Sequence, residues 1–469
     1  MGSLPASIES AAARLLRVRG IRGLAVGAFD RDGVLFAEGV GYADLEAGRL
    51  ATSRTVFRVA SISKLATATL ILRLADEGQV DLDAPVVDLL PADLQPLDAE
   101  GRPAPSTVAS LLSHSSGLPA GIRGVDAGNP VLSRLLNQGR VDDLASSIRG
   151  LRLTHPPDDR VVYSNPAFNL LGYVAARIAG RSFEAAAAEQ VLEPLGMVDS
   201  AFASQRSGPQ VARSYGSLVP PKVGVAPLAD FRLLATPMGG LTTTVEDLAR
   251  FGQMVLAGGR AGDAPFLSPE LLGRATTIRA TNHPDLEQGF GLGFKVRPWR
   301  GRTVVGHDGN MPGVATQLVL SPDDGVGVVV LTNGFALAVP HELAALTLEH
   351  VLGLEPEVRR EDGDADTQAW EAFGRRVEGA YRMLDASPPG PLGRLDGLLG
   401  RARVTHEARG RLRVDGQPGA DAPVWLHPTS ALGRYRTSAG VDDGSMAIVE
   451  ERADGPHLWL GFANHLRRR

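Results

Sequence analysis

Apolar positions at helical spacing are clearest in the segment 57–78, FRVASISKLATATLILRLADEG. They recur at intervals of three and four residues and stop at Gly78, a pattern typical of a helix with one buried face. The residues on this face are Leu65, Ala68, Leu72 and Ala75. A polar start precedes them, because Ser61, Ser63 and Lys64 occupy the positions where the first helical turn should begin.

A period of two replaces the helical period on either side of this segment. Residues 21–44 alternate around the turn sequence Asp-Arg-Asp-Gly at 30–33, which predicts a β-hairpin. Short β-branched segments return later in the chain, at 291–298, 302–309, 314–322 and 325–334. A helix is expected after them at 340–354, and helical segments fill the middle. These elements predict an α+β fold, with one antiparallel sheet built from both ends and a helical layer inserted.

The composition changes after Leu354, where a charged stretch with few aliphatic residues is interpreted as a linker. From 369 onwards the chain consists of short alternating segments separated by turn residues, a spacing typical of a small antiparallel barrel or sandwich. We therefore expect a first domain at 1–354, a linker at 355–368 and a β-rich C-terminal domain at 369–469.

Composition and charge exclude several classes of function. The 469 residues carry 48 Lys and Arg against 53 Asp and Glu, and this net charge of -5 argues against a nucleic-acid or membrane-surface role. The chain has no cysteine, which excludes disulfides, thiolate metal sites and a cysteine nucleophile. No metal or other cofactor is expected, and the arginines at 467–469 are interpreted as a solvated tail.

The start of the chain bears on its location. We find no apolar run of the roughly 18 residues that a membrane span requires. The first 20 residues have an amphipathic helical pattern through Leu4, Ile8, Ala12 and Leu15, unlike the basic and apolar regions of a signal peptide. We expect a cytoplasmic protein, with a signal peptide removed ahead of Met-Gly-Ser as the alternative.

Ser61 and Lys64 are three residues apart, so both side chains project from one face within one helical turn. One interpretation is structural: the serines cap the helix and Lys64 is solvated at an exposed end. The other is chemical, because a serine hydroxyl becomes a nucleophile when a lysine, kept neutral by desolvation or nearby cations, takes its proton. The spacing alone does not decide between them.

Two further groups of residues add candidate chemistry. Tyr163 and Asn165 lie in an extended segment just before a helix, in VVYSNPAFNLLGY, where alternate side chains face the same way. A tyrosine can share a proton with a serine or a leaving group, and an asparagine amide can hold a carbonyl or a lysine. In VVGHDGNMPG, His307 follows a strand, and Gly309 permits close approach of a ligand to the strand edge. The structural alternatives are a half-buried loop aromatic and a structural histidine.

Taken in chain order, these motifs resemble the penicillin-recognising serine hydrolases, in the branch with class C β-lactamases, DD-carboxypeptidases, D-aminopeptidases and related family VIII esterases. The motifs are Ser-x-x-Lys, Tyr-x-Asn and His-x-Gly, and supporting matches are VFRVASISK, LLSHSSGLP, YSNPAFNLLG, GGLTTTVEDLARF and GVGVVVLTN. The resemblance covers roughly residues 5–353 and implies the α/β/α transpeptidase fold with an all-helical subdomain. Residues 369–469 resemble, by strand spacing and position, the lipocalin-like barrel appended to some peptidase-like and peptide-cyclising members.

The resemblance implies a role for each matching side chain. Ser61 would be the acylated nucleophile and Lys64 the base that activates it. Tyr163 would relay the proton to the leaving group and later help to activate the acceptor. Asn165 would position Lys64 and the substrate amide.

The resemblance also implies the oxyanion hole and the substrate preference. The backbone N–H groups of Ser61 and of Asn310, the residue after Gly309, would stabilise the oxyanion. His307 stands where true β-lactamases carry the lysine of a Lys-Thr-Gly box, and this weakens the fixed positive charge that would hold a β-lactam carboxylate. Weak or absent β-lactamase activity is therefore expected.

These implications predict a serine hydrolase of esterase or peptidase type that acts through an acyl-enzyme on ester or amide bonds. Its partner would be a small-molecule or peptide-like substrate, without nucleic acid or membrane, and the oligomeric state is left open. The alternatives are an acyltransferase or peptide cyclase that passes the acyl group to an amine, and a penicillin-binding sensor that acylates without turnover. The complete set of Ser61, Lys64, Tyr163 and His307 favours turnover.

Overall fold

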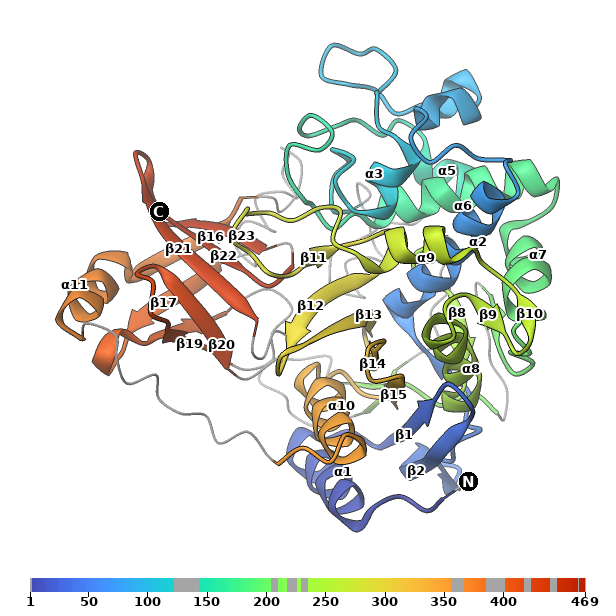
Figure 1. Ribbon diagram of the computed structural model, residues 1–469, viewed down its shortest axis with the longest axis horizontal. Coiled ribbons are helices and arrows are strands. Elements are labelled where there is room, and N and C mark those ends of the chain that lie inside the picture. Colours follow the sequence, from blue (N-terminus) through green and yellow to red (C-terminus); the bar gives the residue numbers. More distant parts are fainter. Residues whose placement is uncertain are drawn as a thin grey trace.

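The structure is a computed structural model that describes residues 2–121, 143–203, 210–216, 226–228, 235–355, 367–384, 401–416, 423–438, 445–462 and 464–468. Within these residues, an eight-stranded antiparallel sheet occupies the centre of the N-terminal part, in the order β11-β12-β13-β14-β15-β1-β2-β3 (Figure 1). Its strands are β1 (Gly23–Asp30), β2 (Val34–Asp44), β3 (Arg49–Leu50), β11 (Gly289–Phe290), β12 (Lys295–Trp299), β13 (Arg302–Met311), β14 (Val314–Ser321) and β15 (Val326–Thr332).

The sheet joins the two ends of this part of the chain, as the alternating pattern predicted. Strand β1 pairs with β2 along one edge and with β15 along the other, so that Val26 lies opposite Glu38 and Val330. The turn of the predicted hairpin is closed by two hydrogen bonds. The N–H of Asp30 donates to the Gly33 carbonyl at 3.0 Å, and the N–H of Gly33 donates to Asp30 Oδ1 at 2.9 Å.

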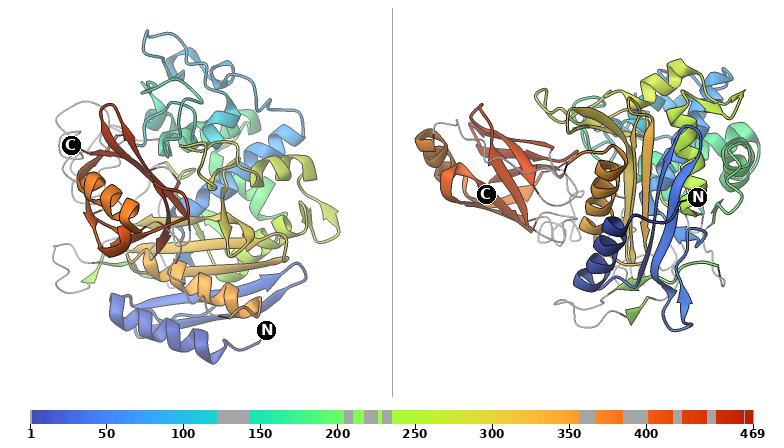
Figure 2. Two further views of the ribbon diagram at one scale, coloured as in Figure 1. Left: turned by 60° about the vertical axis from the view of Figure 1, so that its left-hand side comes forward. Right: turned by 60° about the horizontal axis from the view of Figure 1, so that its bottom comes forward.

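Helices cover both faces of the sheet (Figure 2, right). Helices α1 (Ala6–Arg19) and α10 (Ala338–Val351) pack on one face, and α2 (Ser63–Asp76) and α8 (Val245–Leu256) pack on the other. Successive residues of a central strand are therefore both buried, each in a different hydrophobic cluster. The predicted amphipathic pattern of α1 is confirmed, because its apolar residues at the expected spacing are buried against the sheet.

A helical subdomain packs beside α2, and this confirms the predicted α+β architecture of a sheet with flanking helices and a helical insertion. Its helices are α3 (Val108–Leu112), α5 (Leu144–Ile148), α6 (Asn165–Ala179) and α7 (Phe183–Ala187), the last continuing into the π-helical turn η4 (Ala188–Leu192). The remaining short elements are η1 (Ala60–Ile62), η2 (Val86–Leu89), η3 (Ala92–Leu94), α9 (Pro269–Thr276), β4 (Phe57–Arg58), β5 (Ala201–Phe202), β6 (Tyr215–Gly216), β7 (Ala226–Pro227), β8 (Leu241–Thr243), β9 (Arg260–Ala261) and β10 (Ala264–Pro265).

The C-terminal part is a closed antiparallel barrel, as the regular short segments predicted. Eight strands of the described residues form it: β16 (Gly379–Met383), β17 (Arg401–His406), β18 (Leu412–Asp415), β19 (Val424–Pro428), β20 (Arg434–Ser438), β21 (Met446–Arg452), β22 (Gly455–Leu460) and β23 (Asn464–Arg468). The turn η5 (Ala408–Gly410) links β17 to β18, and helix α11 (Thr367–Val377) precedes the first strand. Trp370 and Phe373 of α11 pack into the barrel core.

One expectation about this region is wrong. The arginine tail is not merely solvated, because Arg467 and Arg468 belong to β23, which closes the barrel by pairing with β16; Arg469 lies outside the described residues. Arg467 also donates to Asp454 Oδ2 at 2.8 Å. Helix α11 begins at Thr367, near the end of the predicted linker, and the bounds of that linker stay a prediction.

The barrel contacts the N-terminal part through the segment that leads into β11 (Figure 1). The Gln288 side chain donates to the Met446 carbonyl at 2.6 Å and accepts from the Met446 N–H at 3.2 Å. The ring of Phe462, just after β22, lies against the ring of Phe290 with their centres 5.6 Å apart. Polar and aromatic contacts therefore link the barrel to the edge of the large sheet.

Helices long and apolar enough to cross a membrane do not occur in the part of the chain that the structure describes.

The closure of the barrel by β23 yields a stability prediction. Leu466 is fully buried in the barrel core, so Leu466→Ala should leave a cavity and lower the free energy of barrel unfolding by about 2–5 kcal/mol. Leu432→Ala is the matched control, because this leucine is 51% exposed. Urea unfolding monitored by tryptophan fluorescence measures both changes. Equal, small effects of the two substitutions would contradict closure through β23.

Candidate functional site

Ser61 lies in a tight turn ahead of helix α2 and not within it. The 3₁₀ turn η1 carries Ser61, and α2 begins two residues later. Ala60 has a φ of 47°, a left-handed conformation that is uncommon for a residue with a Cβ atom. Ser63 Oγ donates to the Ala60 carbonyl at 2.5 Å and accepts from the Leu241 N–H at 2.9 Å. Ser63 therefore ties the turn at Ser61 to strand β8.

The structural interpretation of this polar start is wrong on both counts. Ile62 is the N-cap of α2, and no side chain of the described residues makes the capping hydrogen bond there. Lys64 is not solvated, since its exposed fraction is 0%. The helix buries its whole first turn because β8 and α6 cover the side that an isolated helix would leave open.

The Lys64 amine lies among neutral oxygens. Its Nζ atom is 3.1 Å from Ser61 Oγ, 2.8 Å from Asn165 Oδ1 and 2.7 Å from the Met238 carbonyl oxygen. The amide and the carbonyl accept hydrogen bonds at these atoms, whereas a hydroxyl both donates and accepts. A neutral amine in this position can donate to Asn165 and Met238 and accept the proton of Ser61.

Tyr163 and Asn165 reach this amine from the start of α6 and the extended segment before it. Ser164 is the N-cap of α6, and its Oγ accepts from the Ala167 N–H at 3.2 Å. This cap fixes where the helix begins, with Asn165 in its first turn and Tyr163 in the extended segment before it. The centre of the Tyr163 ring is 5.0 Å from Lys64 Nζ. The structure thus brings both predicted residues to Lys64.

His307 lies on strand β13, on the face of the sheet that carries α2. It is 1% exposed, and its ring centre is 6.0 Å from that of Tyr163. Nδ1 lies 2.5 Å from the Asp308 carbonyl oxygen, which can only accept, so Nδ1 carries the proton and Nε2 a lone pair. Within the described residues, the buried Nε2 atom has no hydrogen-bond partner. His307 is therefore a neutral ring whose Nε2 is an unused acceptor.

Burial, assisted by the positive charge of Lys295, lowers the pKa of His307 to about 3, so the imidazole is neutral near pH 7. The next residue faces the other way: Asp308 forms an ion pair with Lys295 on the face that carries α10. Burial acts to raise the pKa of Asp308, and the Lys295 ammonium outweighs it and holds that pKa below its usual range. Strand β13 therefore carries a charged carboxylate on the face toward α10 and a neutral imidazole on the face toward α2.

Gly309 lets two backbone segments approach each other closely, and the close approach of a ligand that the sequence suggested stays a prediction. A Cβ atom at this position would lie 2.1 Å from the Val59 carbonyl oxygen and 2.5 Å from Thr316 Oγ1. Thr316 Oγ1 in turn donates to the Val59 carbonyl at 3.1 Å. The absence of a side chain lets β13 pack directly on the chain that leads into Ser61. Asn310 follows, exposed and paired with Ala315 of β14, at the same end of β13.

Some contacts of this arrangement could not be expected from the sequence. The Met238 carbonyl is a backbone group, so side-chain patterns give no signal for it. Ser63 and Thr316 tie neighbouring segments together through hydroxyls that look like ordinary surface residues in the sequence. His114 lies 4.3 Å from Tyr163 between ring centres. It belongs to the LLSHSSGLP segment, which supports the family resemblance, but the sequence predicts no role for His114 itself.

Among the described residues, one group has the composition of a metal site. His283, Asp285 and Glu450 place their ligand atoms within 4.8 Å of one another, where the segment before β11 meets the barrel. The guanidinium of Arg434 already pairs with Asp285, and it lies 3.4 Å from Glu450 Oε1. This cation accounts for the acidic pair, and the group is best described as an ionic contact between the barrel and the N-terminal part.

Comparisons with known proteins give the family and agree with the fold. A family model described as Beta-lactamase matches residues 8–352. Penicillin-binding protein 4 from Amycolatopsis lactamdurans is 29% identical over 297 residues, 61% of this chain and 74% of that protein. Esterase EstB from Burkholderia gladioli is 36% identical over 210 residues, 43% of this chain and 52% of the esterase. The solved structure of the octameric penicillin-binding protein homologue from Pyrococcus abyssi has a TM-score of 0.63 and 24% identity, over 98% of this chain and 99% of its own.

A substitution that adds one methyl group tests the contact between β13 and the turn at Ser61. Gly309→Ala should push β13 away from Val59 and lower the free energy of unfolding by about 1–3 kcal/mol. Gly33→Ala is the control, because none of the described atoms lies within 4 Å of a Cβ atom there. Chemical denaturation gives both values. A Gly309→Ala protein as stable as the control would show that the strand and the turn do not touch as described.

The neutral state of His307 yields a pH prediction. Its pKa is about 3 in the folded protein against about 6.5 when unfolded, so the unfolded chain binds more protons between these values. This contribution to stability is fully present above about pH 6.5 and is lost as the pH falls. Between pH 7.5 and 5, the free energy of unfolding of the wild type should fall by about 1–2 kcal/mol more than that of His307→Asn. Parallel pH profiles of the two proteins would contradict burial of a neutral histidine.

Proposed function

The chain belongs to the beta-lactamase family, and from this premise we propose that it is a serine hydrolase that forms an acyl-enzyme at Ser61. Its substrates are esters or peptide-like amides, in line with the esterase and the penicillin-binding protein among its relatives. The division into a hydrolase domain at 1–354 and a barrel domain at 369–469 is part of the same proposal.

The observation that carries the proposal is the environment of the Lys64 amine. An ammonium taken out of water among neutral dipoles is destabilised relative to the free amine. Lys64 is fully buried, and Asn165 Oδ1 and the Met238 carbonyl are placed to accept its two remaining N–H groups. Its lone pair is then directed at Ser61 Oγ, 3.1 Å away, which is the distance that general-base catalysis requires.

In acylation, Lys64 takes the proton of Ser61 as Oγ bonds to the substrate carbonyl carbon. The carbonyl oxygen becomes an oxyanion, which the backbone N–H groups of Ser61 and Asn310 stabilise by about 3 kcal/mol each. Tyr163 passes the proton from Lys64 to the leaving group as the bond to that group breaks. A water molecule then gives its proton to the same pair of residues, attacks the acyl carbon and releases the acid with Ser61 restored.

The chemistry of His307 favours a neutral group on the substrate beside it. A neutral imidazole with a free acceptor on Nε2 can receive a hydrogen bond from an N–H or O–H group, but it offers no positive charge to a carboxylate. Esters and amides meet this condition, whereas a β-lactam carries a carboxylate. We therefore propose esterase or amidase activity with weak or no β-lactamase activity.

The test of the function is intact-protein mass spectrometry during turnover of a p-nitrophenyl ester of a short acid. The wild type should release p-nitrophenol continuously while only a transient adduct of the acyl mass is present. Ser61→Ala should form no adduct and lose more than about 100-fold in kcat, because only the nucleophile is removed and the turn is held by Ser63.

Two results would reject parts of this proposal. Turnover by Ser61→Ala at more than about a hundredth of the wild-type rate would remove Ser61 from the nucleophilic role. A stoichiometric adduct that persists on the wild type without further release would identify a sensor that acylates and does not turn over. Free hydroxylamine added as an acceptor separates hydrolysis from transfer, because an acyltransferase gives the hydroxamate in preference to the acid.

A further inference from the structure

His114 makes contact with the chain on both sides of Tyr163 and with the Tyr163 ring itself. We propose that His114 is a positioning residue that holds the Tyr163 side chain in place for proton transfer to the leaving group. The inference rests on the proposed function, since it assigns a partner to the residue that would relay the proton.

Two backbone hydrogen bonds bracket Tyr163. The N–H of Val162 donates to the His114 carbonyl at 2.9 Å, and the N–H of Ser164 donates to His114 Nδ1 at 3.0 Å. The imidazole lies against the tyrosine ring with a centre-to-centre distance of 4.3 Å and an angle of 33° between the planes. One residue therefore fixes the backbone before and after Tyr163 and supports one face of its ring.

The protonation state of His114 suits this role. A backbone N–H can only donate, so Nδ1 must be the unprotonated nitrogen and Nε2 carries the proton. Burial is the main cause that lowers the pKa of His114 well below its usual value, so the ring stays neutral and Nδ1 remains an acceptor. Nε2 is buried and has no hydrogen-bond partner in the described residues. The hydrogen bond that the His114 ring makes is thus directed at the Tyr163 segment.

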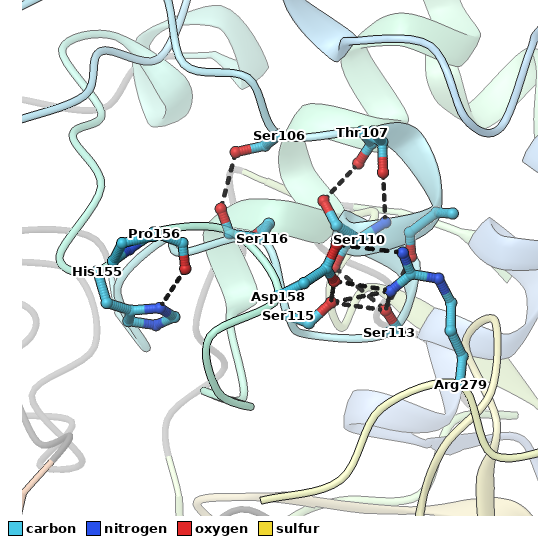
Figure 3. Close-up of polar contacts among 11 residues, drawn as sticks. Ser106, Thr107, Ser110, Ser113, Ser115, Ser116, His155, Pro156, Asp158 and Arg279 are labelled. Carbon is cyan, nitrogen blue, oxygen red and sulfur yellow. Dashed lines mark hydrogen bonds and ion pairs between the residues drawn. The ribbon is translucent and has the colours of Figure 1, made fainter.

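The serines on either side of His114 hold it in an unusual backbone conformation. His114 has a φ of 59°, in the left-handed region. Figure 3 shows Arg279 pointing at Ser113, Ser115 and Asp158. Arg279 Nη1 donates to Ser113 Oγ at 2.9 Å, to Ser115 Oγ at 3.0 Å and to Asp158 Oδ1 at 3.0 Å. The flanking residues are therefore anchored, and the strained position between them is kept.

Aromatic contacts support the other sides of the His114 ring and continue to the barrel. Phe168 of α6 lies 5.2 Å from His114 between ring centres, and Phe290 of β11 lies 4.7 Å away in an edge-on arrangement. Phe290 also contacts Phe462 from the barrel. The tyrosine is thus supported by a series of tilted and edge-on rings that runs from the helical subdomain through β11 to the C-terminal part.

The competing explanation is that His114 only fills the core. Esters with different leaving groups distinguish this structural role from the positioning of Tyr163. p-Nitrophenolate departs without a proton, whereas an alkoxide from an ethyl ester of the same acid needs one. If His114 acts through Tyr163, His114→Ala should lower kcat about 30-fold on the ethyl ester and about 3-fold on the p-nitrophenyl ester, with KM little changed. In a Tyr163→Phe background, His114→Ala should change kcat by less than about 2-fold, because the partner is already lost.

Two further variants complete the design. His114→Asn keeps an acceptor at the position of Nδ1 and tolerates the left-handed backbone, but it removes the ring. It should therefore fold and show an intermediate loss on the ethyl ester. His457→Ala is the control for loss of a buried histidine: it removes a side chain that is 5% exposed and hydrogen-bonded to Asp454 within the barrel. It should leave both substrates within about 2-fold of the wild type.

Several outcomes would overturn the inference. Equal losses on the two esters, or a loss in the Tyr163→Phe background as large as in the wild type, would mean that His114 acts on the fold alone. Failure of both His114 variants to fold, judged by circular dichroism, would mean the same. If Tyr163→Phe shows no leaving-group effect while Ser61→Ala is inactive, the roles of Tyr163 and His114 both fall and the acyl-enzyme proposal stands.

Discussion

Burial of the Lys64 amine is the constraint on which the rest of the structure depends. Taking this group out of water is unfavourable unless polar atoms replace the solvent around it. Three separate parts of the chain supply them: the turn at Ser61, the start of α6 at Asn165 and the backbone at Met238. The central sheet, the helical subdomain and the segment before β8 must therefore all be assembled before the amine has its partners. Under the proposed function, stability and reactivity are coupled at this atom.

Strand β13 lies between the site around Lys64 and the opposite side of the sheet, and its two faces carry different side chains. Toward α2 it carries the neutral His307 and then Gly309, whose lack of a side chain lets the strand touch Val59. Toward α10 it carries Asp308, neutralised by Lys295. The alternation of side chains along a strand thus separates a charged pair from a site that needs neutral groups. A shift of one residue in register would bring the carboxylate to Ser61.

The sequence predicted those features that depend on regular spacing. The hairpin, the late strands and α1 follow from periods of two and 3.6, because each element buries several apolar residues on one side. Strands β16 and β23 carry a weak pattern, because each has one fully buried apolar residue, Tyr381 and Leu466 respectively. Helix α11 did carry a signal, with Trp370, Phe373 and Val377 on one face. The motifs named the side chains around Lys64, but the contacts of backbone groups and of His114 depend on tertiary packing and leave no pattern in a single sequence.

The central claim is that Lys64 acts as the base for Ser61, and the protonation of its amine tests this most directly. Selective labelling of lysine Nζ with nitrogen-15, assigned with Lys64→Arg, allows the amine to be followed by NMR across the pH range in which the acylation rate is measured. The account predicts that Lys64 loses its proton over the same range in which acylation rises. A Lys64 amine that stays protonated at a pH where acylation has reached its full rate would contradict it.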